Sequence, residues 1–562
     1  MVKKNKSNNV VIQAGILAIA SMLVRVIGLL YRAPLTAIIG DEGNGYYGTA
    51  YNIYTIILMV SSYSMPSAIS KLMAQKLAVG EYRNARRVFR CALMYGILVG
   101  LIGSGLLYFG AGVLVPDVAV GVLRVFAPTV FLFGILGSLR GYFQARGSML
   151  PTSISQILEQ LANAVVSLAA AWILMHTLAG ENATRQAQLG AMGSALGTGA
   201  GVFVALVFML YAFQKDQKSA QELIRSDTKG KTDHYHKFFK ETLLVITPFM
   251  LSGVVMNLTT SLNQTIYMRI MIYLRDVSAT TATTLYGIFS NKAVVISNIP
   301  ISIATAVSSA IIPGISAAFA QNDLEETRTR VGNAIRATAL IAIPSAVGLM
   351  MLARPITMIL FPQMSSLDMA SRMLSMVGVT VLFYSVSTIT NAALQSIGKM
   401  NQPLISAGFA LAAQTVVLVF LLVKVGMDID ALAIASILYS VMIFVVNQYY
   451  LHRYLKLRQN VGTYYIRPLL CALVMGISAR LVYKFVYQVL SPVEALPKGF
   501  YLQNLLALMA ALICAVAVYA FMLIISGSVS RETLQSLPKG QQMIRVLEKL
   551  HCLKKEEKSN GI

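Results

Sequence analysis

Long apolar stretches recur along nearly the whole chain, and this feature restricts the fold more than any other. A helix needs about 20 apolar residues to cross the roughly 30 Å hydrocarbon core of a bilayer. In hydrocarbon, only helices and closed barrels satisfy every backbone polar group. We therefore predict an all-α integral membrane protein with about 14 transmembrane helices. The predicted spans are 10–39, 47–74, 88–111, 119–143, 152–176, 189–213, 238–268, 282–318, 331–361, 371–396, 403–424, 431–452, 465–489 and 502–526.

The composition excludes an ordinary soluble protein. Of 562 residues, 56% are hydrophobic and 12% are charged, whereas a soluble domain carries about 25% charged residues. Lys3, Lys4 and Lys6 before the first apolar run are typical of a signal peptide. The run continues to Ile39, which favours a spanning helix over a cleaved signal. The four cysteines are scattered without a CxxC pair, so no zinc site, other metal site, cofactor or disulfide framework is predicted.

Basic residues outnumber acidic ones by 46 to 23, for a net charge of +23. They gather in alternate loops, and the positive-inside rule then places both termini in the cytoplasm of a cell-membrane protein. We interpret the excess as basic cytoplasmic loops facing anionic membrane lipids rather than as a nucleic-acid surface. A basic tail with apolar residues near helical spacing, 531–558, is predicted to lie on the inner leaflet.

Three motifs recur in the same order on either side of the polar stretch 214–237, which indicates an internal repeat. The pairs are Tyr47-Gly48-x-x-x-Asn52 with Tyr286-Gly287-x-x-x-Asn291, Gln144-x-x-Gly147-x-Met149-x-Pro151 with Gln395-x-x-Gly398-x-Met400-x-x-Pro403, and Leu114-Val115-Pro116 with Leu360-Phe361-Pro362. The repeat unit is six helices. Because that number is even, the two halves have the same orientation in the membrane.

This repeat divides the chain into two parallel six-helix lobes plus two extra C-terminal helices. The predicted parts are an N-lobe at 1–213, a basic cytoplasmic loop at 214–237, a C-lobe at 238–456, helices thirteen and fourteen at 457–526, and a cytoplasmic amphipathic tail at 527–562. Parallel repeats of this kind are typical of secondary transporters that bind substrate between two lobes near the midplane. We expect such a transporter, acting as a monomer.

Several cations lie inside the predicted spans, where a central charge costs roughly 2.5–3.5 kcal/mol on insertion scales. Three of them, Arg25, Arg32 and Lys292, are the candidates for a functional role. Arg25 and Arg32 are nearly two helical turns apart, so they face one side of their helix at about 10 Å along the axis. Lys292 follows Asn291 of the repeated motif. The one clear acid within the spans, Glu159, cannot balance all three. We predict an unbalanced cationic cavity that binds an anion, and two guanidinium groups suit a diphosphate.

Polar side chains at or within the spans are candidates for binding sugar hydroxyls: Asn52, Asn257, Asn263 and Asn291. An interhelical hydrogen bond is the alternative for each of them. Glu159 lies two turns into its helix, near the predicted cytoplasmic end. It either takes part in substrate binding or only orients Arg140 or Gln160.

The sequence RVIGLLYR at 25–32, followed by GDEGNGYYG at 40–48, resembles the opening of MurJ-like flippases. The segments LRGYFQ at 139–144, MLP at 149–151 and QILEQ at 156–160 look like the branch that contains the stage V sporulation protein B family. Both belong to the multidrug/oligosaccharidyl-lipid/polysaccharide superfamily. The resemblance covers essentially the whole chain and is most specific in helices one to five.

The resemblance implies that the chain flips lipid II, the undecaprenyl-diphosphate-linked peptidoglycan precursor, from the inner to the outer leaflet by alternating access. Cell-wall synthesis, cell shape and sporulation are the processes it implies. Arg25 and Arg32 match the family's helix-one arginines, which line a central cavity. Lys292 matches the helix-eight cation approximately, with shifted spacing, and Asp41 or Glu42 matches the acidic position of the first outer loop. The helix-two arginine of some members has no counterpart in the uncharged stretch 54–60.

Three alternatives stay open. The first is a flippase for another lipid-linked glycan, since cavity shape decides which sugar binds. The second is a multidrug antiporter, which needs intramembrane carboxylates that are scarce here. The third is a membrane-embedded enzyme, which needs clustered acids of the kind that bind magnesium, and none appears in the sequence. We therefore predict a transporter and not an enzyme.

Overall fold

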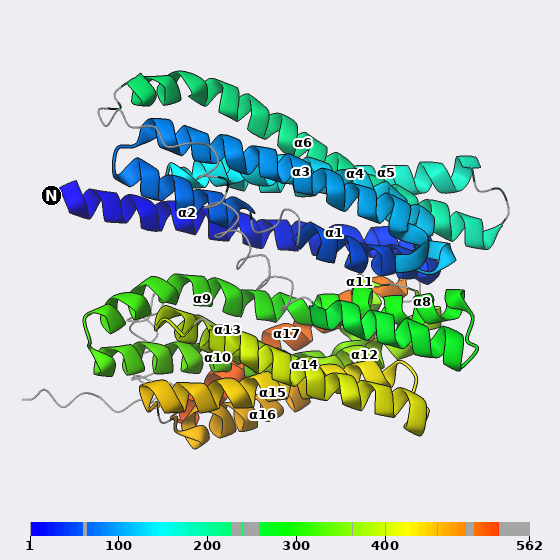
Figure 1. Ribbon diagram of the computed structural model, residues 1–562. Coiled ribbons are helices and arrows are strands. Elements are labelled where there is room, and N and C mark those ends of the chain that lie inside the picture. The colour runs from blue at the N-terminus through cyan, green and yellow to red at the C-terminus, as the bar shows by residue number, and fades with distance from the viewer. Residues whose placement is uncertain are drawn as a thin grey trace, which may run out of the picture. The chain divides into compact units, whose positions relative to one another are not determined.

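The computed structural model describes residues 2–59, 65–178, 180, 182–225, 227, 239, 258–361, 363–399, 401–457, 459–490 and 499–527. Every regular element within these ranges is a helix (Figure 1). Eleven of the described helices are long and apolar enough to cross a membrane. The predicted all-helical membrane fold is confirmed, and the exact number of 14 spans stays a prediction. The chain forms two compact units.

Unit 1 comprises Met1–Val295, Leu360–Ser366 and Ala407–Ala435. Its elements are α1 (Val2–Leu58), α2 (Met65–Ala78), α3 (Tyr82–Leu114), α4 (Asp117–Ala145), α5 (Leu150–Leu178), α6 (Ala183–Arg225), the π-helical turns η2 (Ile270–Leu274) and η3 (Ile288–Val294), α8 (Ala279–Gly287), the short 3-10 helix η4 (Met364–Ser366) and the π-helical turn η5 (Leu421–Val425). The long helices α3 to α6 run side by side in Figure 1. One cluster of buried apolar side chains joins α3, α4 and α6 with α1 and α2.

Glycines let α5 and α6 approach closely. Gly193, Gly197 and Gly201 recur every four residues along α6, so they lie on one face. A Cβ on Gly197 would lie 2.0 Å from the Oγ of Ser167, and one on Gly193 would lie 2.4 Å from a backbone nitrogen of α5. This is the small-residue packing that membrane helices use in place of a hydrophobic driving force.

Unit 2 comprises Ile296–Ile359, Leu367–Ser406 and Ser436–Ile562. Its elements are α9 (Val295–Ala320), α10 (Leu324–Met351), α11 (Ala353–Leu360), α12 (Leu367–Gly378), α13 (Thr380–Ser396), the π-helical turn η6 (Gly462–Ile466), α16 (Arg467–Leu490) and α17 (Gly499–Ile525), together with parts of α14 (Asn401–Phe420) and α15 (Asp430–Leu455). Helix α10 packs against both α13 and α16, and α16 packs against α17. Two apolar clusters form its core.

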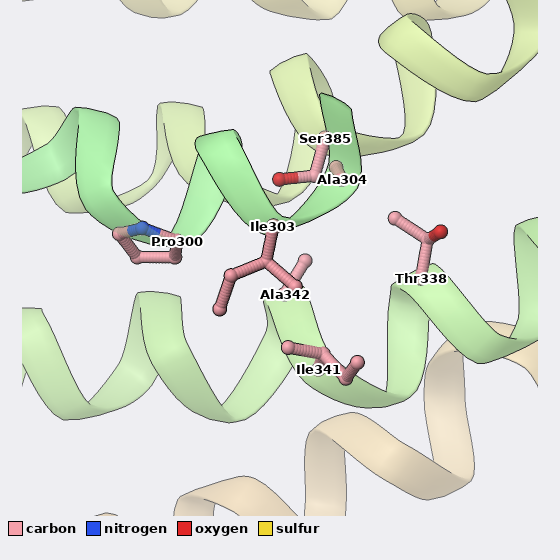
Figure 2. A pocket seen from close by; sticks show the side chains of 7 residues that line it. All are labelled: Pro300, Ile303, Ala304, Thr338, Ile341, Ala342 and Ser385. Carbon is pink, nitrogen blue, oxygen red and sulfur yellow. The ribbon is translucent and has the colours of Figure 1, made fainter. Parts of the chain in front are cut away.

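A small pocket in unit 2 lies where α9, α10 and α13 meet (Figure 2). Ile303 and Pro300 of α9 line it, together with Thr338 of α10 and Ser385 of α13. Its volume of about 10 Å³ is that of a single water molecule. This pocket therefore cannot hold a sugar headgroup.

The structure changes some predicted boundaries. The first predicted span and the start of the second form one helix, α1, of 57 residues, which bends at Gly40 with a φ of 68°. The eighth predicted span comprises α8, η3 and α9. The predicted loop 214–237 begins as helix, because α6 continues to Arg225. The tail at 531–558 lies outside the described residues, and the division into lobes stays a prediction.

Candidate functional site

The part of α1 after Gly40 crosses α8 and η3 at very close range within unit 1. A Cβ on Gly45 would lie 2.5 Å from the carbonyl oxygen of Thr283. A Cβ on Gly287 would lie 2.5 Å from the Cα of Gly45, and one on Gly48 would lie 2.2 Å from the Nδ2 of Asn291. We call this contact the α1–α8 crossing. Only glycine at these positions lets the two backbones come this near.

The two copies of one repeated motif meet at the α1–α8 crossing. Asn52 of the first copy donates hydrogen bonds to the hydroxyl of Tyr286 in the second, at 3.1 Å, and to Oε1 of Gln264, at 2.6 Å. Asn291 of the second copy donates to the backbone oxygen of Asn44 at 2.7 Å. The motif predicted from sequence as a sign of duplication is therefore also a contact. Residues of the two copies, although not the equivalent ones, contact each other.

Lys292 lies at the same crossing, in the π-helical turn η3, and its side chain is only 1% exposed. Its ammonium group forms an ion pair with Asp41, whose side chain is 12% exposed. The Nζ also donates to Oγ of Ser366 at 2.8 Å and to Oε1 of Gln363 at 3.2 Å. The ring of Phe361 lies 5.7 Å from it. The ammonium group of Lys292 is thus paired with an acid, and Asp41, Ser366 and Gln363 accept its hydrogen bonds. A buried charge needs such partners, because burial without them is very costly.

The prediction that Lys292 is uncompensated is therefore wrong. Asp41 was expected in a loop outside the bilayer, but the bend at Gly40 lets α1 continue and brings this carboxylate to the lysine. The neighbouring Glu42 accepts a hydrogen bond from the hydroxyl of Tyr46, one turn further along α1. In this conformation Asp41 and Glu42 are each bonded to another residue of the protein.

Arg32 has a different environment. Its guanidinium group lies close to Tyr31, Tyr47 and Tyr51, and it is partly exposed. Within the described ranges, no carboxylate forms an ion pair with it. The side chain of Arg25 lies outside the described residues, so the predicted pairing of the two arginines on one face stays a prediction. Arg32 is thus a cation of α1 that lies beside tyrosine side chains and forms an ion pair with none of the carboxylates that the structure describes.

The tyrosines beside Arg32 belong to an aromatic cluster of α1 and α4. Tyr47 stacks on Tyr51 with ring centroids 5.5 Å apart, and Tyr54 stacks on Phe126 at 4.6 Å. The spacing of these tyrosines, three and four residues apart, places them on one face of α1. This spacing is visible in the sequence, and our sequence analysis missed it.

Glu159 forms an ion pair with Arg140 at 2.7 Å, and Arg140 also donates to Oγ of Ser155 at 2.9 Å. Of the two roles considered for this acid, the geometry supports orientation of Arg140. Asn263 accepts a hydrogen bond from Gln414 at 2.7 Å, which is the interhelical alternative. Asn257 lies outside the described residues.

A family model described as "Polysaccharide biosynthesis protein" matches residues 10–319, more than half of the chain. The chain belongs to this polysaccharide biosynthesis protein family. A second model, described as "MatE", matches residues 253–421. Both matches reach η3 and so include the second copy of the motif at the α1–α8 crossing.

Two curated relatives of this family member come from Bacillus subtilis (strain 168). Lipid II flippase MurJ is 23% identical over 83% of this chain and 87% of its own length, and Stage V sporulation protein B is 26% identical over 57% and 61%. A solved structure of lipid II flippase MurJ in an inward closed conformation covers 90% of this chain and 98% of its own, with a TM-score of 0.61 at 15% identity.

An inward-facing multidrug resistance MATE family transporter has the same fold. It covers 77% of this chain and 99% of its own, with a TM-score of 0.59 at 16% identity. The chain is thus a multi-pass membrane protein of the polysaccharide biosynthesis protein family, and it shares its fold with MurJ and with MATE transporters.

Proposed function

We propose that the chain flips an undecaprenyl-diphosphate-linked cell-wall glycan, lipid II, from the inner to the outer leaflet of the cell membrane. The observation that carries this proposal is Arg32, a cation inside a spanning helix with no carboxylate partner among the described residues. A guanidinium group binds phosphate through two parallel hydrogen bonds. The hydroxyls of the surrounding tyrosines supply further donors.

The ligand follows from this chemistry and from the relatives. A diphosphate bearing sugars cannot cross hydrocarbon unaided, because burying an unpaired charge is very costly. A site with Arg32 and tyrosines replaces part of its hydration, while a prenyl tail stays in lipid. One of the two relatives is named lipid II flippase MurJ, and it supports the same substrate class.

The α1–α8 crossing is, in this proposal, the closure on the outer side. The basic loops place both termini in the cytoplasm, so the bend at Gly40 lies toward the outside. The crossing joins residues of the proposed lobes 1–213 and 238–456 through bonds that can break and re-form. Opening it frees Asn52 and Asn291 to bind sugar hydroxyls. Alternating access then consists of closing one side of the site while the other opens.

The direction of transport is supported by the membrane potential. With a negative interior, outward movement of an anion gains about 2.3 kcal/mol per charge per 100 mV. The site must also weaken in the outward state, since a site that held the diphosphate tightly in both states would trap it.

A drug antiporter is the second candidate, because the "MatE" model matches residues 253–421. Proton- or sodium-coupled exchange of cations needs an intramembrane acid that is free to bind them. Asp41 and Glu159 are each paired with a basic side chain, and Glu42 accepts a hydrogen bond from Tyr46. This pairing favours the anion flippase. Uptake of a cationic dye into proteoliposomes, driven by a proton or sodium gradient, would favour the antiporter.

The test is a flipping assay with purified protein in liposomes that carry fluorescent lipid II. We expect Arg32→Ala to abolish flipping and Arg32→Lys to retain part of it, because lysine keeps the charge without the planar fork. Arg124→Ala is the matched control, since Arg124 is an exposed arginine beside the ring of Tyr108 in the same unit. Full flipping by Arg32→Ala would refute the proposal. Faster flipping of another undecaprenyl-diphosphate glycan would reassign the substrate.

A further inference from the structure

A second cavity lies in unit 1, away from Arg32 and the α1–α8 crossing. It has a volume of about 500 Å³ and is formed by the ends of α2, α3, α4 and α6. This volume falls within the range of small-molecule binding sites, about 300–1,000 Å³. Nothing in the proposed flipping cycle uses this cavity.

The cavity lies at the predicted cytoplasmic side of the membrane. Helices α2 and α3 are joined by a turn at this end, as are α4 and α5, and α6 ends here after its last crossing. The same end carries the basic residues that orient the chain: Lys76, Arg83, Arg86, Arg87, Arg90, Arg140, Arg146, Lys215, Lys218 and Arg225. A ligand here meets the inner leaflet.

The lining changes from charged to apolar along α3. Arg86 and Arg90 lie one turn apart on the same face of its first turns, and both line the cavity. Phe89 and Leu93 line it as well, and Leu93 lies deeper along the helix. Arg86 has no hydrogen-bond or ion-pair partner among the side chains that the structure describes. A phosphate group with an attached hydrocarbon chain has the matching polarity.

The wall of the cavity is held in place by strong contacts. Arg146 forms an ion pair with Asp216 at 2.6 Å, and the hydroxyl of Tyr142 donates to the same carboxylate at 2.7 Å. Tyr142 also packs against Phe89 and Phe213, with ring centroids 5.0 Å apart in both cases. Asp216 lies near the C-terminal end of α6, two residues before the end of its apolar stretch Ala183–Lys218. This end of α6 therefore completes a pre-formed site.

The chain after α6 is anchored at the same place. Asp227 accepts a hydrogen bond from the backbone N–H of Arg83 at 2.8 Å, at the start of α3. The residue before α3, Glu81, makes no capping bond with its side chain. Asp227 thus caps α3 from a distant part of the sequence and keeps the first turn, with Arg86, in position.

We propose that this cavity binds an anionic phospholipid of the inner leaflet, with the phosphate on Arg86 and Arg90 and an acyl chain along Phe89, Leu93 and Phe213. Charge complementarity selects the headgroup, because no acid is among the described residues that line the cavity. The carboxylate of Asp216, which is outside the lining, neutralises Arg146. The apolar part of the lining selects a lipid over a soluble phosphate compound. Basic pockets between membrane helices on the cytoplasmic side bind anionic lipids in this way.

Native mass spectrometry of the purified full-length protein tests this, with dioleoylphosphatidylglycerol as the probe and dioleoylphosphatidylcholine for comparison. We expect the wild-type protein to bind the anionic lipid at least about tenfold more tightly, and the double variant R86Q/R90Q to lose that preference. Arg83→Gln is the matched control: it removes the same charge from the same helix at a position outside the cavity. Ala220→Phe, which fills the cavity, should weaken binding with every arginine in place.

Three results would overturn the proposal. One is an unchanged preference in R86Q/R90Q, and another is an equal loss in Arg83→Gln, which would reduce the effect to diffuse surface charge. The third is displacement of the lipid by an equal concentration of glycerol 3-phosphate, which would assign the site to a soluble phosphate. Melting temperatures identify any variant that fails to fold. Because no transport is measured, failure of the flippase proposal would leave this result unaffected.

Discussion

Two helix contacts in unit 1 depend on glycine, and they differ in everything else. At the α5–α6 contact, Gly193, Gly197 and Gly201 meet backbone atoms and the hydroxyl of Ser167, which bonds to neighbouring groups of the same contact. At the α1–α8 crossing, the glycines are surrounded by a buried ion pair and by amide side chains that bond across it. The first contact joins helices within one half of the repeat, and the second joins the two halves.

The difference suggests which contact is permanent. Separating α5 from α6 would lose dense van der Waals packing and the hydrogen bond that Ser167 donates across it to the backbone oxygen of Ser194. Separating α1 from α8 would free an ion pair and several amides, whose bonds water or a sugar can replace at modest cost. In the proposed cycle, close packing holds a half together, whereas polar pairing lets the proposed halves part. The predictions below test that distinction.

The largest effect is expected from Gly197→Leu. The Cβ alone would lie 2.0 Å from Oγ and 2.5 Å from the backbone nitrogen of Ser167, and the backbone cannot yield. We expect loss of folded protein, a destabilisation of more than about 5 kcal/mol. Yield after detergent extraction and thermal unfolding measure it. Gly112→Leu, on α3 with open space around its Cβ position, should change neither. A folded, stable Gly197→Leu protein would contradict the assignment of a permanent contact.

The ion pair gives the next largest effect. Lys292→Met and Asp41→Asn each leave a buried charge without its partner, and each should cost about 3 kcal/mol. The double variant D41N/K292M removes both charges and should recover most of that loss. Thermal unfolding of the four proteins forms a double-mutant cycle. Additive losses would mean that the two side chains do not depend on each other.

A smaller effect is expected from Gly287→Ala. Its Cβ would lie 2.5 Å from the Cα of Gly45, so the crossing must widen, at about 1–3 kcal/mol. We expect a folded protein in which Thr49→Cys, at a fully buried position of the crossing, reacts faster with an impermeant maleimide. The four native cysteines are replaced for this measurement. Gly348→Ala, with nothing near its Cβ position, is the control. Equal reactivity in both variants would refute an opening at this crossing.

The sequence predicted one of these regions better than the other. Apolar length is a local property, so the helical membrane fold could be predicted, and the repeated motif pointed to Asn52 and Asn291. The pairing of Asp41 with Lys292 could not be predicted from the local pattern, because it depends on a bend at Gly40 with a φ of 68°. Periodicity gives the face on which a side chain lies. It does not give the distant residue that the face meets, so a lysine without a nearby acid in sequence looked unpaired.

The smallest effect separates the two contacts most sharply. Asn52→Ala removes two hydrogen bonds across the α1–α8 crossing, to Gln264 and Tyr286, and should cost about 1 kcal/mol. Its matched partner is Asn163→Ala on α5, which lies beside Gly201 of α6 and loses one bond within α5, to Ser167, and one to Tyr31 of α1. Both should lower the melting temperature by a few degrees, but only Asn52→Ala should raise the maleimide reactivity of Thr49→Cys, by about fivefold for that loss. If Asn163→Ala raises the maleimide reactivity of Thr49→Cys equally, the loss of any buried polar bond loosens the whole unit. The α1–α8 crossing would then have no special role as the closure.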